Sequence, residues 1–258
     1  MQLYDAGFIG AGNMGGALVD AALKYTKNIA VYDTDEVKAK AKDAAFLTPT
    51  EIAANCHYVF IGVKPDTVEQ VAKAVTPALQ EYTVIVSMAA GVDLKTLTRL
   101  FQTEKIIRIM PNTPVSVGAG MILYAPAAGV TDVEEEGFLC LMTHAGRIEK
   151  LDESKIDAGM AVSGCGPAYV YMFCEALADG AVKCGLPREK AMLLAEQTIL
   201  GSAKMLLETG RHPGALKDAV CSPGGTTIEC VLALEAGAFR ANVANAVTAA
   251  YEKTKKQK

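Results

Sequence analysis

The chain has 258 residues, of which 51% are hydrophobic and 21% are charged. This is typical of a globular protein that is long enough for one large domain or two modest ones. Its net charge of −4 gives no reason to expect nucleic acid or a membrane as a partner. We find no apolar run long enough to span a bilayer and expect no signal peptide before the first strand.

The first predicted elements are a short buried strand over residues 4–9 and a helix that contains residues 17–23. Between them, Gly10, Gly12 and Gly15 have the spacing G-x-G-x-x-G. In dinucleotide-binding proteins these glycines allow a tight turn, a close approach to the pyrophosphate, and packing of helix on strand. We expect the free N–H groups of Asn13 and Met14 to face the phosphates.

The next strand, residues 29–32, ends at Asp33. An acid about 20 residues after the glycines can accept hydrogen bonds from the ribose hydroxyls of the adenosine. Alternatively, Asp33 is only the N-cap of the following helix. Because strand, glycines, helix, strand and acid follow in order, we predict dinucleotide binding.

Further strands are predicted at residues 57–63, 83–88, 105–109, 120–124 and 146–150. Strands separated by helices predict an α/β fold, with a Rossmann-type, doubly wound, mostly parallel sheet over residues 1–159. Ligands bind beyond the C-terminal ends of such strands. The candidate residues there are Val63, Lys64, Pro65, Ala89, Met110 and Asn112. Alternatively, residues 63–65 only start a helix and residues 110–114 form an ordinary proline turn.

Residues 160–258 show only helical patterns, which predicts an all-helical second domain. We expect helices from Pro167 to about Lys183, from Pro187 to Leu207, after His212, from about Thr226, and from Phe239. The helix from Pro167 is apolar nearly all round and must be covered on most sides. We therefore predict that a second subunit covers it in a homodimer, although a core formed within one chain is an alternative.

Two glycine-rich turns lie in this helical part, at residues 163–167 and 222–227. Each can present backbone N–H groups and hydroxyls at a helix N-terminus, which favours binding of a carboxylate or phosphate. The candidate substrate-binding residues in the second turn are Ser222, Gly224, Gly225 and Thr226, with Thr227 as the candidate catalytic residue. Alternatively, Ser222, Thr226 or Thr227 only caps the helix.

The sequence gives little indication of metal binding, hydrolase chemistry or disulfide bonds. The three histidines have no metal-ligand spacing, so no metal site is predicted, and we find no plausible Ser/His/Asp set. The seven cysteines are scattered and odd in number, which favours a reducing cytoplasm, and we interpret them as buried small hydrophobes. A dinucleotide enzyme without an evident acid or base is suited to reducing an imine, whose nitrogen can arrive protonated.

Six motifs follow one another over essentially the whole chain. They are GFIGAGNMG (7–15), VKP (63–65), SMAAG (87–91), MPNTP (110–114), SGCGPAY (163–169), and LKD (216–218) through SPGGTT (222–227). Together and in this order they resemble those of pyrroline-5-carboxylate reductase. Many dehydrogenases share the glycine turn, but the last three motifs in this order are specific.

The resemblance implies reduction of 1-pyrroline-5-carboxylate to L-proline by NADH or NADPH, the last step of proline synthesis. It also implies a nucleotide-binding domain followed by a helical dimerisation domain, with dimers that often assemble into rings. The substrate carboxylate would lie against residues 222–225 and the Thr227 hydroxyl near the ring nitrogen, while residues 63–65 and 110–114 would line the cofactor. Many relatives carry Ser, Asn or Arg after the second strand to hold a 2′-phosphate, whereas this chain has Tyr32-Asp33-Thr34-Asp35. We therefore expect NADH to be favoured, unless Lys38 or another nearby base reaches a phosphate.

Two alternatives remain at this stage. A β-hydroxyacid dehydrogenase has a similar glycine turn but needs a lysine a few turns into the first long helix of its second domain; here the first is Lys183, at the far end. A non-catalytic NAD-binding sensor or scaffold would not need a carboxylate-binding turn at residues 222–227.

Overall fold

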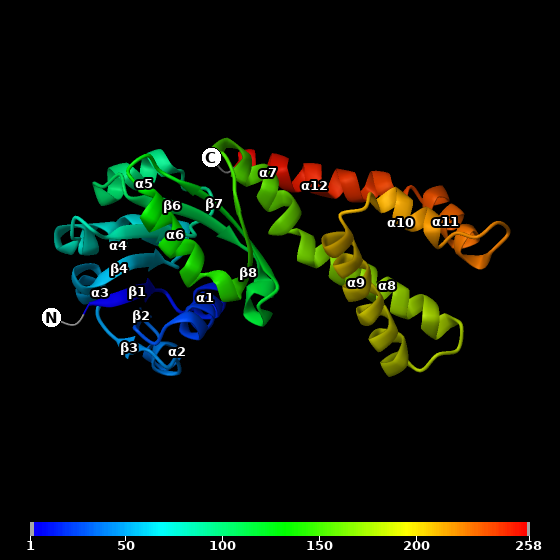
Figure 1. Cartoon of the computed structure of the whole chain (residues 1–258), viewed down its shortest axis with the longest axis horizontal. Coiled ribbons are helices and arrows are strands. Elements are labelled where there is room, and N and C mark those ends of the chain that lie inside the picture. Colours follow the sequence, from blue (N-terminus) through cyan, green and yellow to red (C-terminus); the bar gives the residue numbers. More distant parts are fainter. Residues whose placement is uncertain (1–2, 257–258) are drawn as a thin grey trace. The chain divides into compact units, whose positions relative to one another are not determined.

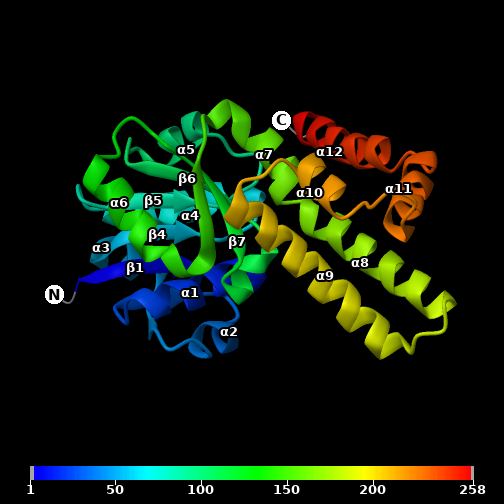
Figure 2. The ribbon, with the colours of Figure 1, turned by 45° about the vertical axis from the view of Figure 1, so that its right-hand side comes forward.

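The computed structural model describes residues 3–256, and its internal contacts divide the chain into two compact units. The first unit contains the residues up to 165 together with those from 251 onward, and the second contains residues 166–250. Figures 1 and 2 show both, coloured along the sequence. The predicted boundary between residues 159 and 160 lies inside helix α7 (Glu153–Ser163) and stays a prediction.

The first unit is built on an eight-stranded sheet with the strand order β3-β2-β1-β4-β5-β6-β7-β8. All neighbouring strands are parallel except β6 and β7, which confirms the α/β prediction of a mostly parallel sheet. The strands are β1 (Tyr4–Ile9), β2 (Ile29–Tyr32), β3 (Ala45–Phe46), β4 (Cys56–Ile61), β5 (Val84–Ser87), β6 (Ile106–Pro111), β7 (Gly120–Pro126) and β8 (Gly146–Lys150).

The antiparallel pair was not foreseen, and it follows from a short connection. Only residues 112–119 separate β6 from β7, and they contain the 3₁₀ turn η3 (Thr113–Val117). A parallel crossover needs a dozen or more residues. The chain therefore turns back at this point, and Pro111 pairs with Ile122.

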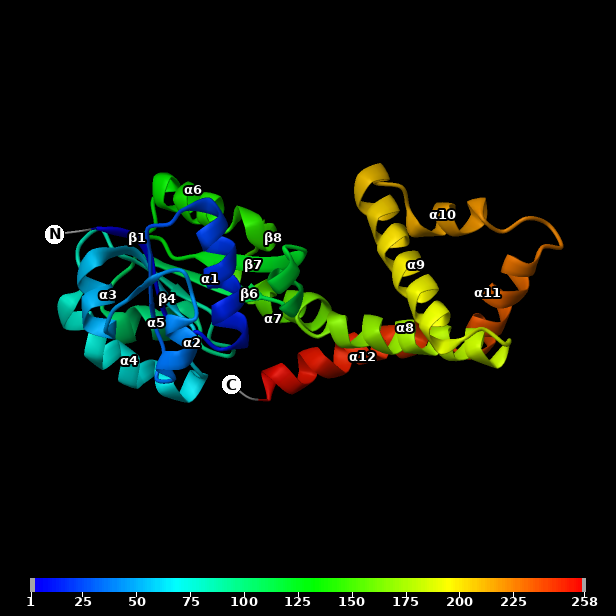
Figure 3. The ribbon, with the colours of Figure 1, turned by 90° about the horizontal axis from the view of Figure 1, so that it is seen from below.

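Helices cover both faces of the sheet, and the strand residues alternate between two cores. Phe8 and Phe60 stack in one core, with ring centroids 4.3 Å apart, and Ile9 and Ile61 belong to the other. The first core packs against α1 (Asn13–Tyr25) and α6 (Asp132–Leu141), and the second against α3 (Pro49–Asn55), α4 (Val68–Val75) and α5 (Leu94–Phe101). Figure 3 shows these two sets on opposite sides of β1 and β4.

The remaining short elements of the first unit are α2 (Glu36–Lys40) and the 3₁₀ turns η1 (Pro65–Thr67), η2 (Thr76–Ala78) and η4 (Thr143–Ala145). The sequence analysis missed β3, which has two residues, and the helices α3 and α7. A signal for α3 was present, because Thr48 and Glu51 form a capping box around Pro49.

The second unit is helical throughout its described residues. It contains α8 (Gly166–Lys183), α9 (Arg188–Thr209), α10 (Pro213–Ala219), α11 (Thr226–Ala236) and α12 (Phe239–Lys255), of which the last residues belong to the first unit. Figure 2 shows α8 and α9 side by side, and their contact buries only Cys174, Ala178, Ala191 and Ala195. No helix among residues 3–256 has the length and apolar composition that a membrane span requires.

Many large apolar side chains of the second unit are exposed. On α8, Tyr171 is 62% and Met172 70% exposed, and α11 has no buried residue. A hollow of about 510 Å³ is lined by apolar residues of α8, α11 and α12, including Phe173, Leu234 and Phe239. These exposed side chains are consistent with the expected cover by a second subunit, which stays a prediction.

The cysteines differ from the prediction. All seven are free thiols, but only Cys56 and Cys174 are buried, whereas Cys184 and Cys230 are exposed. The interpretation of all seven as buried small hydrophobes is wrong. Cys140 and Cys165 of the first unit are half-buried, and the second unit leaves Cys184, Cys221 and Cys230 at least partly exposed because it buries little of its own surface.

Candidate active site

The glycine turn after β1 has the geometry that its sequence indicates. Gly10 has a φ of +107°, and a Cβ there would lie 2.5 Å from the carbonyl oxygen of Gly62, just past β4. A Cβ at Gly15 would lie 2.1 Å from the Gly10 oxygen, so this glycine lets α1 pack on the end of β1. A Cβ at Gly12 would meet nothing within 4 Å. The space in front of Gly12 is therefore open to a ligand.

The start of α1 faces this open space. Gly12 is its N-cap and provides no side-chain hydrogen bond. The N–H groups of the first helical turn have no acceptor within a helix. The amides of Asn13, Met14 and Gly15 therefore suit an anion such as a pyrophosphate, helped by the helix dipole.

Asp33 lies beside the glycine turn, at the end of β2. Its Oδ2 accepts a hydrogen bond from the Ala11 N–H at 2.6 Å, and its Oδ1 accepts one from the Asp35 N–H at 2.9 Å. The N-cap of α2 is Asp35, so the alternative role of Asp33 as that N-cap is not what the structure shows. The contact with Ala11 holds the carboxylate at the mouth of the turn.

A cavity of about 260 Å³ opens where β1, β2 and β4 end. Gly10, Asp33 and Val63 all line it, together with apolar residues such as Ile9 and Val71. Lys64 and Pro65 follow Val63, and Lys64 is the N-cap of η1. A mostly apolar slot with a carboxylate at one side is suited to the adenosine part of a dinucleotide.

Three lysines that follow Asp33 in the chain are each paired with an acid. Lys38 Nζ lies 3.1 Å from Asp35, and Lys40 Nζ lies 2.6 Å from Glu36. Lys42 Nζ lies 2.6 Å from Asp20. The hydrogen bond from Lys38 lowers the pKa of the Asp35 carboxyl. The positive charges of these three lysines are thus already paired with carboxylates.

The other candidates of the first unit lie at the ends of β5 and β6, on the same edge of the sheet. Ala89 comes two residues after β5 and is buried, and Met110 is 7% exposed within β6. Asn112 follows β6 directly, and its side-chain amide makes two hydrogen bonds. Nδ2 donates to the Ser163 carbonyl at 2.9 Å, and Oδ1 accepts from the Met121 N–H at 2.8 Å.

The second glycine-rich turn belongs to the second unit. Gly224 has a φ of +66°, and a Cβ at Gly225 would lie 2.3 Å from Ser222 Oγ. The Gly225 N–H donates to the Ser222 carbonyl at 3.0 Å. Gly225 is the N-cap of α11, with no side-chain cap hydrogen bond, so the capping alternative for Ser222, Thr226 and Thr227 is not what the structure shows. Thr226 and Thr227 are exposed at the start of α11.

Sequence reasoning missed residues that support the site rather than line it. Gly62 packs on Gly10, and its signal was a glycine directly after a buried strand. Arg108 in β6 is 1% exposed and contacts Glu153 and Asp157 of α7, each at 3.2 Å. A lone Arg within an apolar strand was the signal in this case, because a buried charge needs partners.

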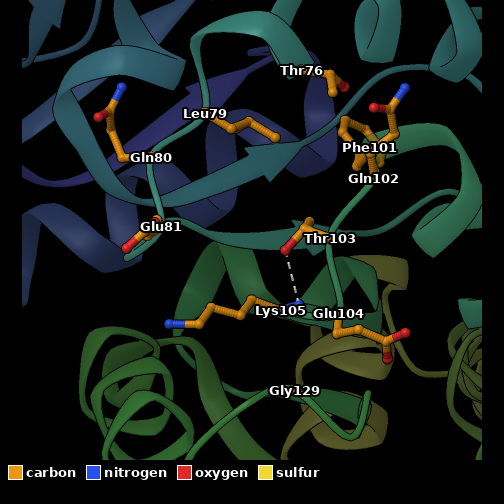
Figure 4. Close-up of a pocket in the computed structure, with 10 residues that line it drawn as sticks. All are labelled: Thr76, Leu79, Gln80, Glu81, Phe101, Gln102, Thr103, Glu104, Lys105 and Gly129. Atoms are coloured by element: carbon orange, nitrogen blue, oxygen red, sulfur yellow. Dashed lines mark hydrogen bonds between the residues drawn. The ribbon is translucent and has the colours of Figure 1, made fainter.

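A larger hollow of about 490 Å³ lies at the opposite edge of the sheet, before β5 and β6 (Figure 4). Several of its polar groups already have partners. Gln80 Nε2 donates to the Ala78 carbonyl, and Thr103 Oγ1 accepts from the Lys105 N–H. Lys105 Nζ pairs with Glu134 at 2.7 Å.

Two family models match the chain. Residues 153–257 match the model described as pyrroline-5-carboxylate reductase dimerisation, and residues 5–91 match one described as NADP oxidoreductase, coenzyme F420-dependent. The second match covers the glycine turn, Asp33 and Val63. The first covers the exposed helices and the turn at residues 222–227.

Individual proteins match over nearly their full length. The pyrroline-5-carboxylate reductase of Escherichia coli is 45% identical over 260 residues, which cover 97% of each chain. The structure of pyrroline carboxylate reductase from Plasmodium falciparum with NADP bound has a TM-score of 0.89 at 34% identity, and covers 99% of this chain and 98% of that one. A pyrroline-5-carboxylate reductase structure from Coxiella burnetii has a TM-score of 0.90 at 32% identity, with the same coverage.

Proposed function

The chain belongs to the pyrroline-5-carboxylate reductase family, and from this premise we propose how its residues divide the work of the reaction. The protein is an oxidoreductase that reduces 1-pyrroline-5-carboxylate to L-proline with a nicotinamide cofactor. The hydride adds to the C=N carbon and a proton ends on the ring nitrogen. One observation carries the proposal that the cofactor binds here: the start of α1 has no side-chain cap, and the space beside Gly12 is open.

The cofactor is held, in this proposal, along one edge of the sheet. The amides of Asn13, Met14 and Gly15 bind the pyrophosphate, and the slot beside Asp33 and Val63 takes the adenosine. The segments Lys64–Pro65, Ala89 and Met110–Asn112, which follow β4, β5 and β6 in turn, line the nicotinamide half. When bound, the cofactor supplies the hydride, and these residues fix its orientation.

NADH is the preferred cofactor in this proposal. The Asp33 carboxylate would accept from the ribose hydroxyls of NADH and repel the 2′-phosphate of NADPH. The pairing of Lys38 with Asp35 and of Lys40 with Glu36 supports this assignment, because neither lysine offers an unmatched charge. Repulsion of like charges that are partly removed from water costs up to a few kcal/mol.

The turn at residues 222–227 binds the substrate in this proposal. The amide of Gly224 and those of Thr226 and Thr227 at the start of α11 face the carboxylate, joined by the Ser222 hydroxyl. Gly225 contributes by leaving room for Ser222 Oγ, since its own N–H already donates within the turn.

Thr227 orients the ring of the substrate. Its hydroxyl donates a hydrogen bond near the ring nitrogen, so that the C=N carbon faces the hydride donor. A threonine hydroxyl is too weak an acid to protonate an imine unaided. The proton therefore comes from solvent, or the substrate binds as the iminium.

The second unit serves assembly as well. We propose a homodimer in which the apolar faces of α8, α11 and α12 cover one another, and larger rings built from such dimers. The exposed Met172 and Phe239 support this, because an apolar surface of this extent is unfavourable in water. We also propose a cytoplasmic location, which the seven free thiols support.

A direct assay tests the proposed function. Purified protein is mixed with racemic 1-pyrroline-5-carboxylate and either NADH or NADPH, and loss of the reduced nucleotide is followed by absorbance. We expect turnover with both and a higher kcat/KM with NADH. Absence of turnover with either would instead favour a non-catalytic dinucleotide-binding protein.

A further inference from the structure

Helix α7 is attached to one face of strand β6 by three successive contacts. Arg108, Met110 and Asn112 are every second residue along extended chain, so their side chains lie on the same face. Arg108 pairs with Glu153 and Asp157 at the start of α7, each at 3.2 Å. Met110 packs in one apolar cluster with Ile156.

Asn112 makes the third contact, at the other end of α7. Its Nδ2 donates to the carbonyl of Ser163, the last residue of the helix. The carbonyls of a last helical turn lack N–H donors within the helix, so the Asn112 amide provides a donor for one of them. Its Oδ1 accepts from the Met121 N–H in β7. Hydrogen bonds at both Nδ2 and Oδ1 therefore fix the orientation of the side-chain amide.

The spacing of the contacts agrees with a helix that runs alongside the strand. Arg108 and Asn112 are four strand residues apart, or about 13 Å. The midpoint of Glu153 and Asp157, the two partners of Arg108, is residue 155. From there to Ser163 the helix advances eight residues, or about 12 Å. The same strand face therefore sets both ends of α7.

We propose that Asn112 is a positioning residue that holds the end of α7 and the residues after it, Ser163–Cys165, at a fixed place relative to the loop Met110–Pro114. Its side-chain amide acts through Ser163 and Met121, whereas its backbone belongs to the segment proposed to line the nicotinamide half of the cofactor. Only the activity part of the test rests on the proposed function. We expect an effect on activity because loss of this contact would let the loop Met110–Pro114 shift, and a misplacement of reacting groups by about 1 Å can cost 100-fold in rate.

The amides next to Ser163 provide a local probe. The N–H groups of Gly164 and Cys165 both donate to the Met160 carbonyl, at 2.8 and 3.1 Å. If the last turn of α7 loosens, both become exposed to solvent and exchange faster. The Met121 amide reports separately on the other half of the Asn112 contact.

The experiment compares Asn112→Ala with Asn112→Asp in the full-length protein. The alanine variant loses both hydrogen bonds, whereas the aspartate variant keeps an acceptor for Met121 and loses the donor to Ser163. Hydrogen exchange at Gly164 and Cys165 should accelerate at least tenfold in both variants, and exchange at Met121 only in the alanine variant. We expect kcat to fall at least tenfold in both, with the Kd of NADH within threefold of wild type.

Two further measurements sharpen the test. In Asn112→Asp, protonation of the new carboxyl restores a donor, so the deficit in kcat should narrow as the pH falls. Ser116→Ala is the matched control, because its hydroxyl donates to the Thr113 carbonyl in the same loop without reaching α7. This control should leave exchange at Gly164 and kcat unchanged.

Several outcomes would overturn the proposal. One is unchanged exchange at Gly164 and Cys165 in both Asn112 variants, and another is an unchanged kcat. A loss of NADH affinity by the same factor as kcat/KM would show that Asn112 contacts the cofactor directly. If wild type shows no turnover, the proposed function fails, while exchange and NADH binding still decide whether Asn112 positions the end of α7.

Discussion

Gly12 and Gly15 belong to one motif but face different surroundings. A Cβ at Gly12 meets nothing within 4 Å, whereas one at Gly15 lies 2.1 Å from the Gly10 oxygen. We expect Gly12→Ala to weaken NADH binding at least tenfold, because the methyl group occupies the approach of the pyrophosphate. Its free energy of unfolding should stay within about 1 kcal/mol of wild type, since Gly12 already has an extended, unstrained N-cap conformation.

Gly15→Ala is the contrasting variant. It should lower both stability and affinity, because α1 must move away from β1. Fluorescence titration with NADH and denaturant unfolding separate the two effects. Wild-type affinity in Gly12→Ala would mean that no ligand approaches there.

Asp33 determines the choice of cofactor in our proposal. Replacing it with serine removes the charge next to the ribose, so Asp33→Ser should lower the ratio of kcat/KM for NADH to that for NADPH or reverse it. Asp33→Asn should do the same while keeping an oxygen acceptor for the Ala11 N–H. Comparing the two variants separates the effect of the Asp33 charge on cofactor choice from the effect of its hydrogen bond to the glycine turn. A wild-type preference for NADPH of tenfold or more would refute the role of Asp33.

Thr227 and Thr226 form an internal comparison at the start of α11. Thr227→Ala should lower kcat/KM for pyrroline-5-carboxylate about 100-fold, or roughly 2–3 kcal/mol, and leave the Kd of NADH nearly unchanged. Thr226→Ala should have a much smaller effect. Steady-state kinetics of both variants check this, and near-full activity of Thr227→Ala would remove its assigned role.

At this scale the sequence reveals residue types better than their contacts. The glycine spacing predicted the turn because each glycine stands where a side chain would clash with nearby backbone or block the approach of a ligand. The bonds from Asp33 to Ala11 and from Asn112 to Ser163 join residues far apart in the chain. No local pattern encodes such pairs, so the sequence analysis predicted neither bond.

Among the elements, ends marked by glycine and proline were predicted well. Gly185 and Gly210 have φ values of +97° and +62° just past α8 and α9, as left-handed helix ends favour. Helix α7 was missed because its buried face carries Asp157 for the pair with Arg108. An acid on the inner face breaks the apolar periodicity that marks a helix.

Glu134 on α6 gives a pH-dependent test of one element. Its side chain is 9% exposed and pairs with Lys105 at 2.7 Å. Burial raises the pKa of the Glu134 carboxyl, but hydrogen bonds from Lys105 and Thr131 outweigh it and hold the pKa below the ordinary value of 4.5. A carboxyl with a lowered pKa stabilises the fold above that value, and this contribution is lost as the pH falls through the folded-state pKa.

Glu134→Gln should therefore lower the free energy of unfolding by about 2 kcal/mol at pH 7, and the difference should shrink below about pH 4.5. Glutamine can still complete the capping box with Thr131, so the change isolates the charge. Denaturant unfolding at neutral and acidic pH measures it. Glu136→Gln, exposed on the same helix, should change little, and a Glu134→Gln deficit of equal size at both pH values would contradict the account.

For the whole molecule, the exposed apolar surface of the second unit predicts self-association. Met172 on α8 is 70% exposed, so Met172→Asp should not disturb the isolated unit but should place a charge in the proposed interface. Sedimentation at micromolar concentration should show a dimer or larger for wild type and a shift toward monomer for the variant. Val133→Asp, at an 80% exposed position on α6, is the control. A well-folded, active wild-type monomer would contradict the dimer.

The central claim is that this chain passes a hydride from a nicotinamide cofactor to the imine carbon of 1-pyrroline-5-carboxylate. The most direct measurement uses NADH deuterated at both C4 positions, with mass spectrometry and NMR of the product. The account predicts L-proline that carries one deuterium, at the ring carbon that was double-bonded to nitrogen. Proline without deuterium, or no proline with either nucleotide, would contradict it.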